Sequence, residues 1–280
     1  MSASFDEAFP LVDLRPADSY ASAHFRGATH LPWPDLKERL SELPPRPAEL
    51  QLVGDVACLE EACAFLNEKG YRVVQAWDET DYLTELQKSP GLGVSGMGSK
   101  RLWQPNSLLV WLVESSGLLA STSHSTSTQR LWDIGCGGGR DAVYMAQQGF
   151  EVTAIDQQDA VLSRARRFSD RQGVSVHWKG CSVNEADCLP NETVEVVVMM
   201  RYLNRDLFPR LRQAIRPGGF VVMQTFIEGV EAFGSPKNPN FILKRGELAK
   251  TFSDFTIIVD KIDTLKDGRP VSSFIAQKKI

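Results

Sequence analysis

A short stretch near the middle of the chain combines an acid and glycines at a spacing that suits a cofactor site. Asp133 stands two residues before Gly135, and glycines recur at Gly137 and Gly139. Glycine lets the backbone pass close to a bound molecule where a Cβ atom would clash. The dinucleotide-binding pattern G-x-G-x-x-G would need a further glycine where the chain has Arg140. The stretch therefore predicts a turn for a nucleotide-like cofactor other than a dinucleotide.

The elements around this turn are those that such a site requires. Residues 130–134 form an apolar, strand-like run, and residues 141–148 have apolar positions at helical spacing before Gly149 ends the helix. Residues 150–156 are typical of a second strand, which ends on Asp156. Ligands of doubly wound parallel sheets bind at the carboxyl ends of the strands, so we expect Asp156 to converge with the glycine turn.

This arrangement resembles motif I of class I S-adenosylmethionine-dependent methyltransferases. The resemblance implies that Asp133 meets the ammonium group of the cofactor and that Asp156 accepts its ribose hydroxyls. Because S-adenosylmethionine has no phosphate, the turn need not direct a full set of N–H donors at an anion. Ser182 and the backbone of Val183 take the place of the acid that usually contacts adenine. The predicted cofactor-binding residues are Asp133, Gly135, Cys136, Gly137, Gly139, Asp156, Gln157, Ser182, Val183 and Arg201.

The rest of the second half follows the order of the same family. Residues 194–200 are a continuous apolar run, as expected of a strand buried on both faces. Residues 207–226 have the pattern of a helix, a turn and a strand, and residues 254–279 contain two strand-like runs about an Asp267-Gly268 turn. The resemblance implies an α/β, Rossmann-like domain over residues 102–280, with a seven-stranded sheet that ends in an antiparallel hairpin.

Three residues after the 194–200 run are candidates to meet the methyl acceptor: Arg201, Tyr202 and Arg205. We predict catalytic roles for them, because two guanidinium groups could hold an anionic substrate. Gly246-Glu247-Leu248 resembles the GEL motif of small-molecule and metalloid methyltransferases similar to tellurite-resistance enzymes. We expect methyl transfer to a thiol, a metalloid or an anionic metabolite. Such transfer needs mainly positioning and exclusion of water, so a catalytic base is optional.

The first part of the chain alternates short apolar strands with helical patterns, which predicts a small α/β domain over residues 1–88. Residues 11–32 and 61–77 resemble the rhodanese-like domain family. In active members the nucleophilic cysteine directly follows the central strand, a position that falls near Val53 or Gly54 here, whereas Cys58 lies farther along. The resemblance implies a degenerate, inactive domain. The alternatives are an active sulfurtransferase that uses Cys58, and a non-catalytic regulator that binds S-adenosylmethionine.

Composition narrows the remaining classes of function. Residues 89–101 are rich in Gly, Ser and Pro and predict a flexible linker. The net charge of -4 offers no general attraction to nucleic acid, and no run reaches the roughly 18 apolar residues of a membrane span. Five scattered cysteines without a C-x-x-C pair predict reduced thiols and no metal site. We expect a cytoplasmic protein with a small-molecule substrate; its oligomeric state does not follow from the sequence.

Overall fold

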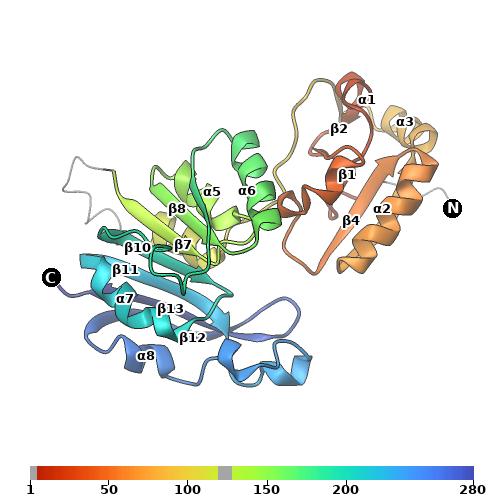
Figure 1. Ribbon diagram of the computed structural model, residues 1–280. Coiled ribbons are helices and arrows are strands. Elements are labelled where there is room, and N and C mark those ends of the chain that lie inside the picture. The colour runs from red at the N-terminus through yellow and green to blue at the C-terminus, as the bar shows by residue number, and fades with distance from the viewer. Residues whose placement is uncertain (1–4, 119–127) are drawn as a thin grey trace. The chain divides into compact units, whose positions relative to one another are not determined.

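The computed structural model describes residues 5–118 and 128–280, and the chain divides into two compact units after Gln104 (Figure 1). Unit 1 comprises residues 1–104, and unit 2 comprises residues 105–280. Each unit has its own sheet and its own hydrophobic core. No helix among the described residues is long and apolar enough to cross a membrane.

Unit 1 is built on a four-stranded parallel sheet with the order β3-β1-β4-β5. Its strands are β1 (Leu11–Asp13), β2 (His24–Phe25), β3 (Thr29–His30), β4 (Ala48–Gly54), β5 (Tyr71–Asp78) and β6 (Gly93–Val94). Its helices are α1 (Ala17–Ser22), α2 (Val56–Glu68) and α3 (Glu79–Lys88), with short 3-10 turns at Asp35–Lys37 and Leu40–Glu42. Leu59, Ala62 and Leu66 recur at helical spacing in α2 and are buried in the core with β4.

The segment predicted as a flexible linker, residues 89–101, is bound to unit 1, so that prediction is wrong. β6 pairs antiparallel with β2. The Tyr20 hydroxyl donates to the carbonyl oxygen of Gly98 at 2.6 Å, and the backbone N–H of Lys100 donates to the carbonyl oxygen of Ala28 at 3.0 Å. Composition alone misleads here because backbone groups can be satisfied by a neighbouring segment without help from apolar side chains.

Unit 2 is built on a seven-stranded sheet with the order β12-β13-β11-β10-β7-β8-β9. Its strands are β7 (Arg130–Ile134), β8 (Glu151–Asp156), β9 (His177–Gly180), β10 (Val194–Met200), β11 (Ile215–Phe226), β12 (Phe255–Thr264) and β13 (Pro270–Lys278). Its helices are α4 (Ser107–Val110), a π-helical turn (Trp111–Ser115), α5 (Arg140–Gln147), α6 (Asp159–Arg171), α7 (Phe208–Ala214) and α8 (Glu247–Thr251). Short 3-10 turns lie at Arg205–Leu207, Val230–Phe233 and Pro239–Phe241.

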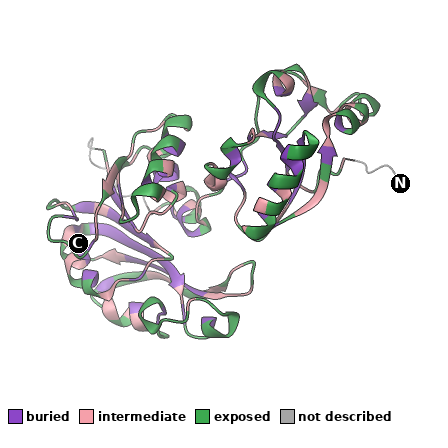
Figure 2. Ribbon diagram, turned by 45° about the vertical axis from the view of Figure 1, so that its right-hand side comes forward, coloured by how far each residue is buried: buried purple, intermediate pink, exposed green. Residues whose placement is uncertain are grey.

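In unit 2 the carboxyl ends of the central parallel strands lie at the candidate site. Helices α5 and α6 lie on one side of the sheet, and α7 and α8 lie on the other (Figure 1). The central strands are buried between these layers (Figure 2). Strands β7 to β11 run parallel, and the strand order reverses between β7 and β10, which is where ligands of such sheets bind. The predicted hairpin is confirmed, because β12 pairs antiparallel with β13 up to Thr264 and Pro270.

Two of the cysteines depart from the expectation of reduced thiols. Cys181 and Cys188 form a disulfide in the loop between β9 and β10, with their Cα atoms 5.7 Å apart. Chain reversal in this loop brings together two residues that show no pairing signal in the sequence. Cys58, Cys63 and Cys136 are free thiols.

Candidate active site

The glycine turn between β7 and α5 satisfies its own backbone donors. The N–H groups of Gly135 and Cys136 both donate to the carbonyl oxygen of Ile155 in β8, at 2.8 and 3.1 Å. The N–H of Gly139 donates to the carbonyl oxygen of Cys136 at 3.0 Å. Because these three donors are already engaged, they are not available to a phosphate group. This agrees with the expectation of a cofactor that lacks phosphate.

The glycines of the turn are required for different reasons. Gly135 has φ of 73°, and a Cβ atom there would lie 2.5 Å from Cγ of Tyr202. Gly137 has φ of 52°, but a Cβ atom on it would meet nothing within 4 Å. The tight approach at Gly135 is therefore made by a side chain of the protein itself, and the space for a ligand opens over Gly137.

Asp133 supplies a buried carboxylate that lacks a partner. The residue is 2% exposed, and its Oδ2 atom accepts no hydrogen bond from the described residues. Burial raises the pKa of Asp133 well above its usual range, and the nearby negative charge of Asp141 raises it further. The backbone N–H of Ala142 acts in the opposite direction. An unpaired, buried carboxylate oxygen fits a cationic group, so the ammonium-bearing cofactor expected from the sequence suits this site.

Asp156 is the last residue of β8, and its side chain accepts a hydrogen bond from the glycine turn. Its Oδ2 atom accepts the N–H of Gly137, and its Oδ1 atom accepts the N–H of Gln158, both at 3.0 Å. Each carboxylate oxygen can accept a second hydrogen bond, so Asp156 keeps the capacity to bind ribose hydroxyls. The N–H of Cys181 donates to the carbonyl oxygen of Asp156 at 3.3 Å. This contact brings the following loop, with Ser182 and Val183, beside Asp156.

The other predicted cofactor residues differ in exposure. Val183 is 8% exposed and belongs to the hydrophobic core, Ser182 is half-buried, and Gln157 is exposed. The thiol of Cys136 is half-buried, and its burial, with the charges of Asp133 and Asp156, raises its pKa. Cys136 therefore remains protonated and can line the site without acting as a nucleophile.

Arg201 and Tyr202 follow β10 directly and border the turn. Arg201 has φ of 56°, a left-handed conformation that non-glycine residues seldom adopt, and its N–H donates to the carbonyl oxygen of Gln224 at 2.6 Å. Burial raises the pKa of Asp141, and the positive charge of Arg201 opposes that rise; the same charge adds to the lowering of the pKa of Asp267 by Arg269. Strained backbone of this kind is often found at functional sites.

Arg205, predicted to contact the acceptor, is engaged elsewhere. Its guanidinium group pairs with Glu247, at 2.5 Å from Nε to Oε1 and 2.9 Å from Nη2 to Oε2, and donates to the carbonyl oxygens of Asn240 and Ile242. Every nitrogen of the group thus has a partner in the segment before α8. The prediction of a catalytic role is corrected: Arg205 holds this segment to the turn after β10.

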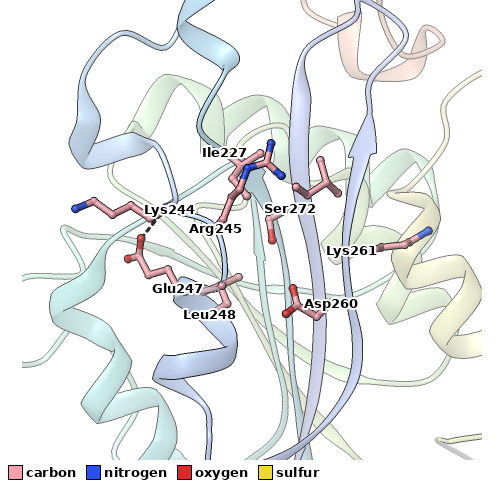
Figure 3. A pocket seen from close by; sticks show the side chains of 10 residues that line it. Ile227, Lys244, Arg245, Glu247, Leu248, Asp260, Lys261 and Ser272 are labelled. Carbon is pink, nitrogen blue, oxygen red and sulfur yellow. Dashed lines mark hydrogen bonds between the residues drawn. The ribbon is translucent and has the colours of Figure 1, made fainter.

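Glu247 belongs to the Gly246-Glu247-Leu248 stretch, beside which lies a cavity of about 200 Å³ (Figure 3). Its carboxylate also accepts the N–H of Lys244 at 2.9 Å, as the dashed line in Figure 3 shows. The side chains of Lys244 and Lys261 extend away from this cavity. The polar groups around the stretch are therefore used to fix the start of α8.

Three residues that the sequence analysis missed connect the site. The N–H of Asn106 donates to Oδ1 of Asp141 at 2.7 Å, and its Nδ2 atom donates to Oε1 of Gln224 at 2.8 Å. Asp141 could have been suspected, because it lies in the first turn of the helix that follows the motif. Asn106 and Gln224 carry no signal, because only the packing of α4 against β11 brings them together.

Comparisons with known proteins agree with this site. Residues 132–219 match the family described as a methyltransferase domain. An uncharacterized protein of Schizosaccharomyces pombe is 25% identical over 95% of this chain and 93% of its own length. A ubiquinone biosynthesis O-methyltransferase of Rickettsia canadensis is 30% identical over 37% of this chain, and the match spans 46% of that relative.

A solved structure, TehB from Haemophilus influenzae, aligns with 66% of this chain and 73% of its own at a TM-score of 0.47 and 16% identity. The family match itself begins in β7 and ends in β11, and so includes the glycine turn, Asp133 and Asp156. Residues 132–219 thus match a methyltransferase domain, and the glycine turn that they contain fits the expected cofactor, S-adenosylmethionine.

Proposed function

We propose that unit 2 transfers a methyl group from S-adenosylmethionine to a small-molecule acceptor. The observation that carries the proposal is the glycine turn, which offers open space over Gly137 beside the unpaired, buried Oδ2 atom of Asp133. The similarity to the ubiquinone biosynthesis O-methyltransferase of Rickettsia canadensis supports an acceptor of small size. The thiol, metalloid and anionic classes expected from the sequence all remain within this proposal.

We infer the roles of individual residues from the family resemblance, and their contacts support this inference. Asp133 in its ionised form holds the ammonium group, and Asp156 holds the ribose while its bonds to Gly137 and Gln158 keep the carboxylate in place. Ser182 and Val183 flank the adenine. When bound, S-adenosylmethionine supplies a methyl group already activated by its positive sulfonium.

Arg201 and Tyr202 border the acceptor in this proposal. Tyr202 packs against Gly135 and fills the space beside the turn, which helps to exclude water from the reacting atoms. Arg201 is fixed by its N–H bond to Gln224, so its position relative to β11 is set before any substrate arrives.

Isothermal calorimetry with S-adenosylhomocysteine tests the cofactor site, and transfer of radiolabelled methyl groups to fractionated cell extract tests catalysis. We expect saturable binding and labelling of small molecules. Absence of binding by the wild-type protein would refute the proposal. Binding without labelling of any fraction would favour the alternative of a non-catalytic regulator.

We infer that unit 1 is a rhodanese-like domain without sulfurtransferase activity. The side chain of Asp55 caps α2 and accepts the N–H of Cys58 at 2.9 Å, so a carboxylate already occupies the helix end that would stabilise a thiolate. Burial and the charge of Asp55 raise the pKa of Cys58 to about 11. A thiosulfate:cyanide assay of the wild-type protein tests this inference; activity that Cys58→Ser abolishes would contradict it.

A further inference from the structure

A second cavity in unit 2 has a volume of about 580 Å³ and lies between the first helix of the unit and the outer strands of the sheet. Leu108 and Trp111 form one wall, and Gln224 of β11 with Val259 and Lys261 of β12 form the other. All of its lining residues belong to unit 2. The role of this cavity follows from its position, its size and its charge.

The cavity adjoins the candidate active site through Gln224. Gln224 pairs in register with Met200, the last residue of β10, and its carbonyl oxygen accepts the N–H of Arg201 at 2.6 Å. Its side chain is held on both sides, because Oε1 accepts from Asn106 and Nε2 donates to Ser273, each at 2.8 Å. A molecule in this cavity would therefore lie one strand away from the residues at the end of β10 that border the cofactor turn.

The size and the walls of the cavity favour an organic ligand. A volume of about 580 Å³ lies within the range of roughly 300–1,000 Å³ that is typical of sites for drug-sized molecules. A metalloid oxyanion would leave most of this space empty. Trp111 is 38% exposed, and its indole offers a surface against which an aromatic ring can pack.

The charges around the cavity disfavour an anion. Among the described residues that line it, Lys261 is the single cation, and Asp263 lies on the same face of β12, whereas the side chain of Asp260 points toward the other cavity (Figure 3). Lys261 is also neutralised locally, because its Nζ atom lies 3.1 Å from Oδ1 of Asp263. A carboxylate or phosphate group entering the cavity would therefore find no unpaired cation among the described lining residues.

We propose that this cavity binds the methyl acceptor and that the acceptor is a neutral or cationic organic molecule with an aromatic or similarly flat apolar part. The inference rests on the proposed methyl transfer and narrows its three acceptor classes to organic molecules without a negative charge. In the reaction the lone pair of the acceptor atom forms the new bond to the methyl carbon. The bond from that carbon to the sulfonium sulfur breaks, its electron pair stays on sulfur, and an acceptor proton is released to solvent.

The test compares three matched probes by ligand-observed NMR titration of the protein saturated with S-adenosylhomocysteine: thioanisole, 4-(methylthio)benzylamine and 4-(methylthio)benzoate. Thioanisole and the benzylamine bind, and the benzoate binds about tenfold more weakly because its carboxylate loses water without gaining an unpaired cation. Trp111→Leu weakens thioanisole binding about fivefold, since it removes the aromatic contact but keeps an apolar side chain.

Ile262→Ala serves as the control, because Ile262 lies on the same strand but lines the other cavity, and thioanisole binding stays unchanged. In the variant Asp263→Asn, which frees Lys261 from its partner, the benzoate gains about fivefold in affinity, whereas thioanisole does not. Benzoate binding at least as tight as that of thioanisole would overturn the inference, and so would thioanisole binding that is absent or insensitive to Trp111→Leu.

The affinity for S-adenosylhomocysteine, measured by calorimetry for each variant, distinguishes a failure of the proposed function from a failure of the acceptor inference. If the wild-type protein does not bind S-adenosylhomocysteine, the proposed function fails. If it binds S-adenosylhomocysteine but the aromatic probes do not behave as stated, only the acceptor inference fails. Unchanged S-adenosylhomocysteine affinity also shows that the variants of the cavity are folded.

Discussion

In each unit the chain leaves a buried parallel strand and enters a helix, but the two turns are built differently. In unit 1, β4 ends at Gly54 and Asp55 caps α2 at once, so the helix end is closed by a carboxylate of the protein. In unit 2, a longer glycine turn separates β7 from α5, and its N-cap, Gly139, brings no side chain. The glycine turn leaves open space over Gly137, whereas a carboxylate already occupies the start of α2 in unit 1.

Glycine substitutions in the two turns should differ most in their effects. Gly135→Ala places a Cβ atom 2.5 Å from Tyr202 at a positive φ, so we expect it to lower the free energy of unfolding of unit 2 by about 2–4 kcal/mol and to abolish S-adenosylhomocysteine binding. Gly54→Ala meets its nearest atoms only at 3.5 Å and should be tolerated. Urea unfolding, monitored by hydrogen exchange of peptides from each unit, measures the change in stability that each substitution causes. Equal effects of the two substitutions would contradict the comparison.

Substitution of Asp156, the residue proposed to bind the ribose, should give the next largest effect. Asp156→Ala removes the acceptor for the N–H groups of Gly137 and Gln158 and the predicted bonds to the cofactor, so we expect S-adenosylhomocysteine affinity to fall by about tenfold or more. Calorimetry measures the change, and Asp159→Ala, three residues farther along the chain, is the control. If both variants bind like the wild type, Asp156 does not contact the ligand.

Cofactor binding should depend on pH through Asp133. Because burial raises its pKa in the free protein, the ionised form is disfavoured in the folded state, and stability is lost as pH rises from the usual range of an aspartate toward the raised value. A bound ammonium group favours the ionised form, so affinity should rise with pH over the same interval, and binding should release up to about one proton. Asp141, whose pKa burial also raises, titrates with Asp133.

Calorimetry of S-adenosylhomocysteine binding in two buffers with different ionisation enthalpies counts the released protons. We expect Asp133→Asn to bind more weakly and to release fewer protons than the wild type. Proton release that is absent in the wild-type protein would argue against an ionised Asp133 in the complex.

The capped turn of unit 1 should give the smallest effects. Asp55→Ala removes the side chain that caps α2, and we expect a loss of about 1 kcal/mol in the stability of unit 1 without any gain of sulfurtransferase activity. Alkylation of Cys58 by iodoacetamide, followed by mass spectrometry, should accelerate only as pH approaches the pKa of about 11. Fast alkylation near neutral pH would show that the thiol is activated and would reopen the sulfur-transfer alternative.

The sequence was sufficient to predict those parts of the site whose residues lie close together along the chain. Asp133, the glycine turn and Asp156 were predicted to converge, and Asp156 does bind the turn through Gly137. Arg205 and the disulfide were predicted wrongly for the same reason. Loops bring Glu247 to Arg205 and Cys188 to Cys181. The sequence shows each arginine and cysteine but does not show which partner the folded chain places beside it.

The sequence by itself determined the class of the cofactor turn, because glycine spacing and the placing of acids are local properties that the backbone obeys wherever the strand and helix form. It also determined the strand pattern that ends in the β12–β13 hairpin. Only the tertiary structure decided what surrounds the acceptor. The cavity lined by Trp111, Gln224 and Lys261 joins three elements distant in sequence, and its size and charge arise from packing that no single segment encodes.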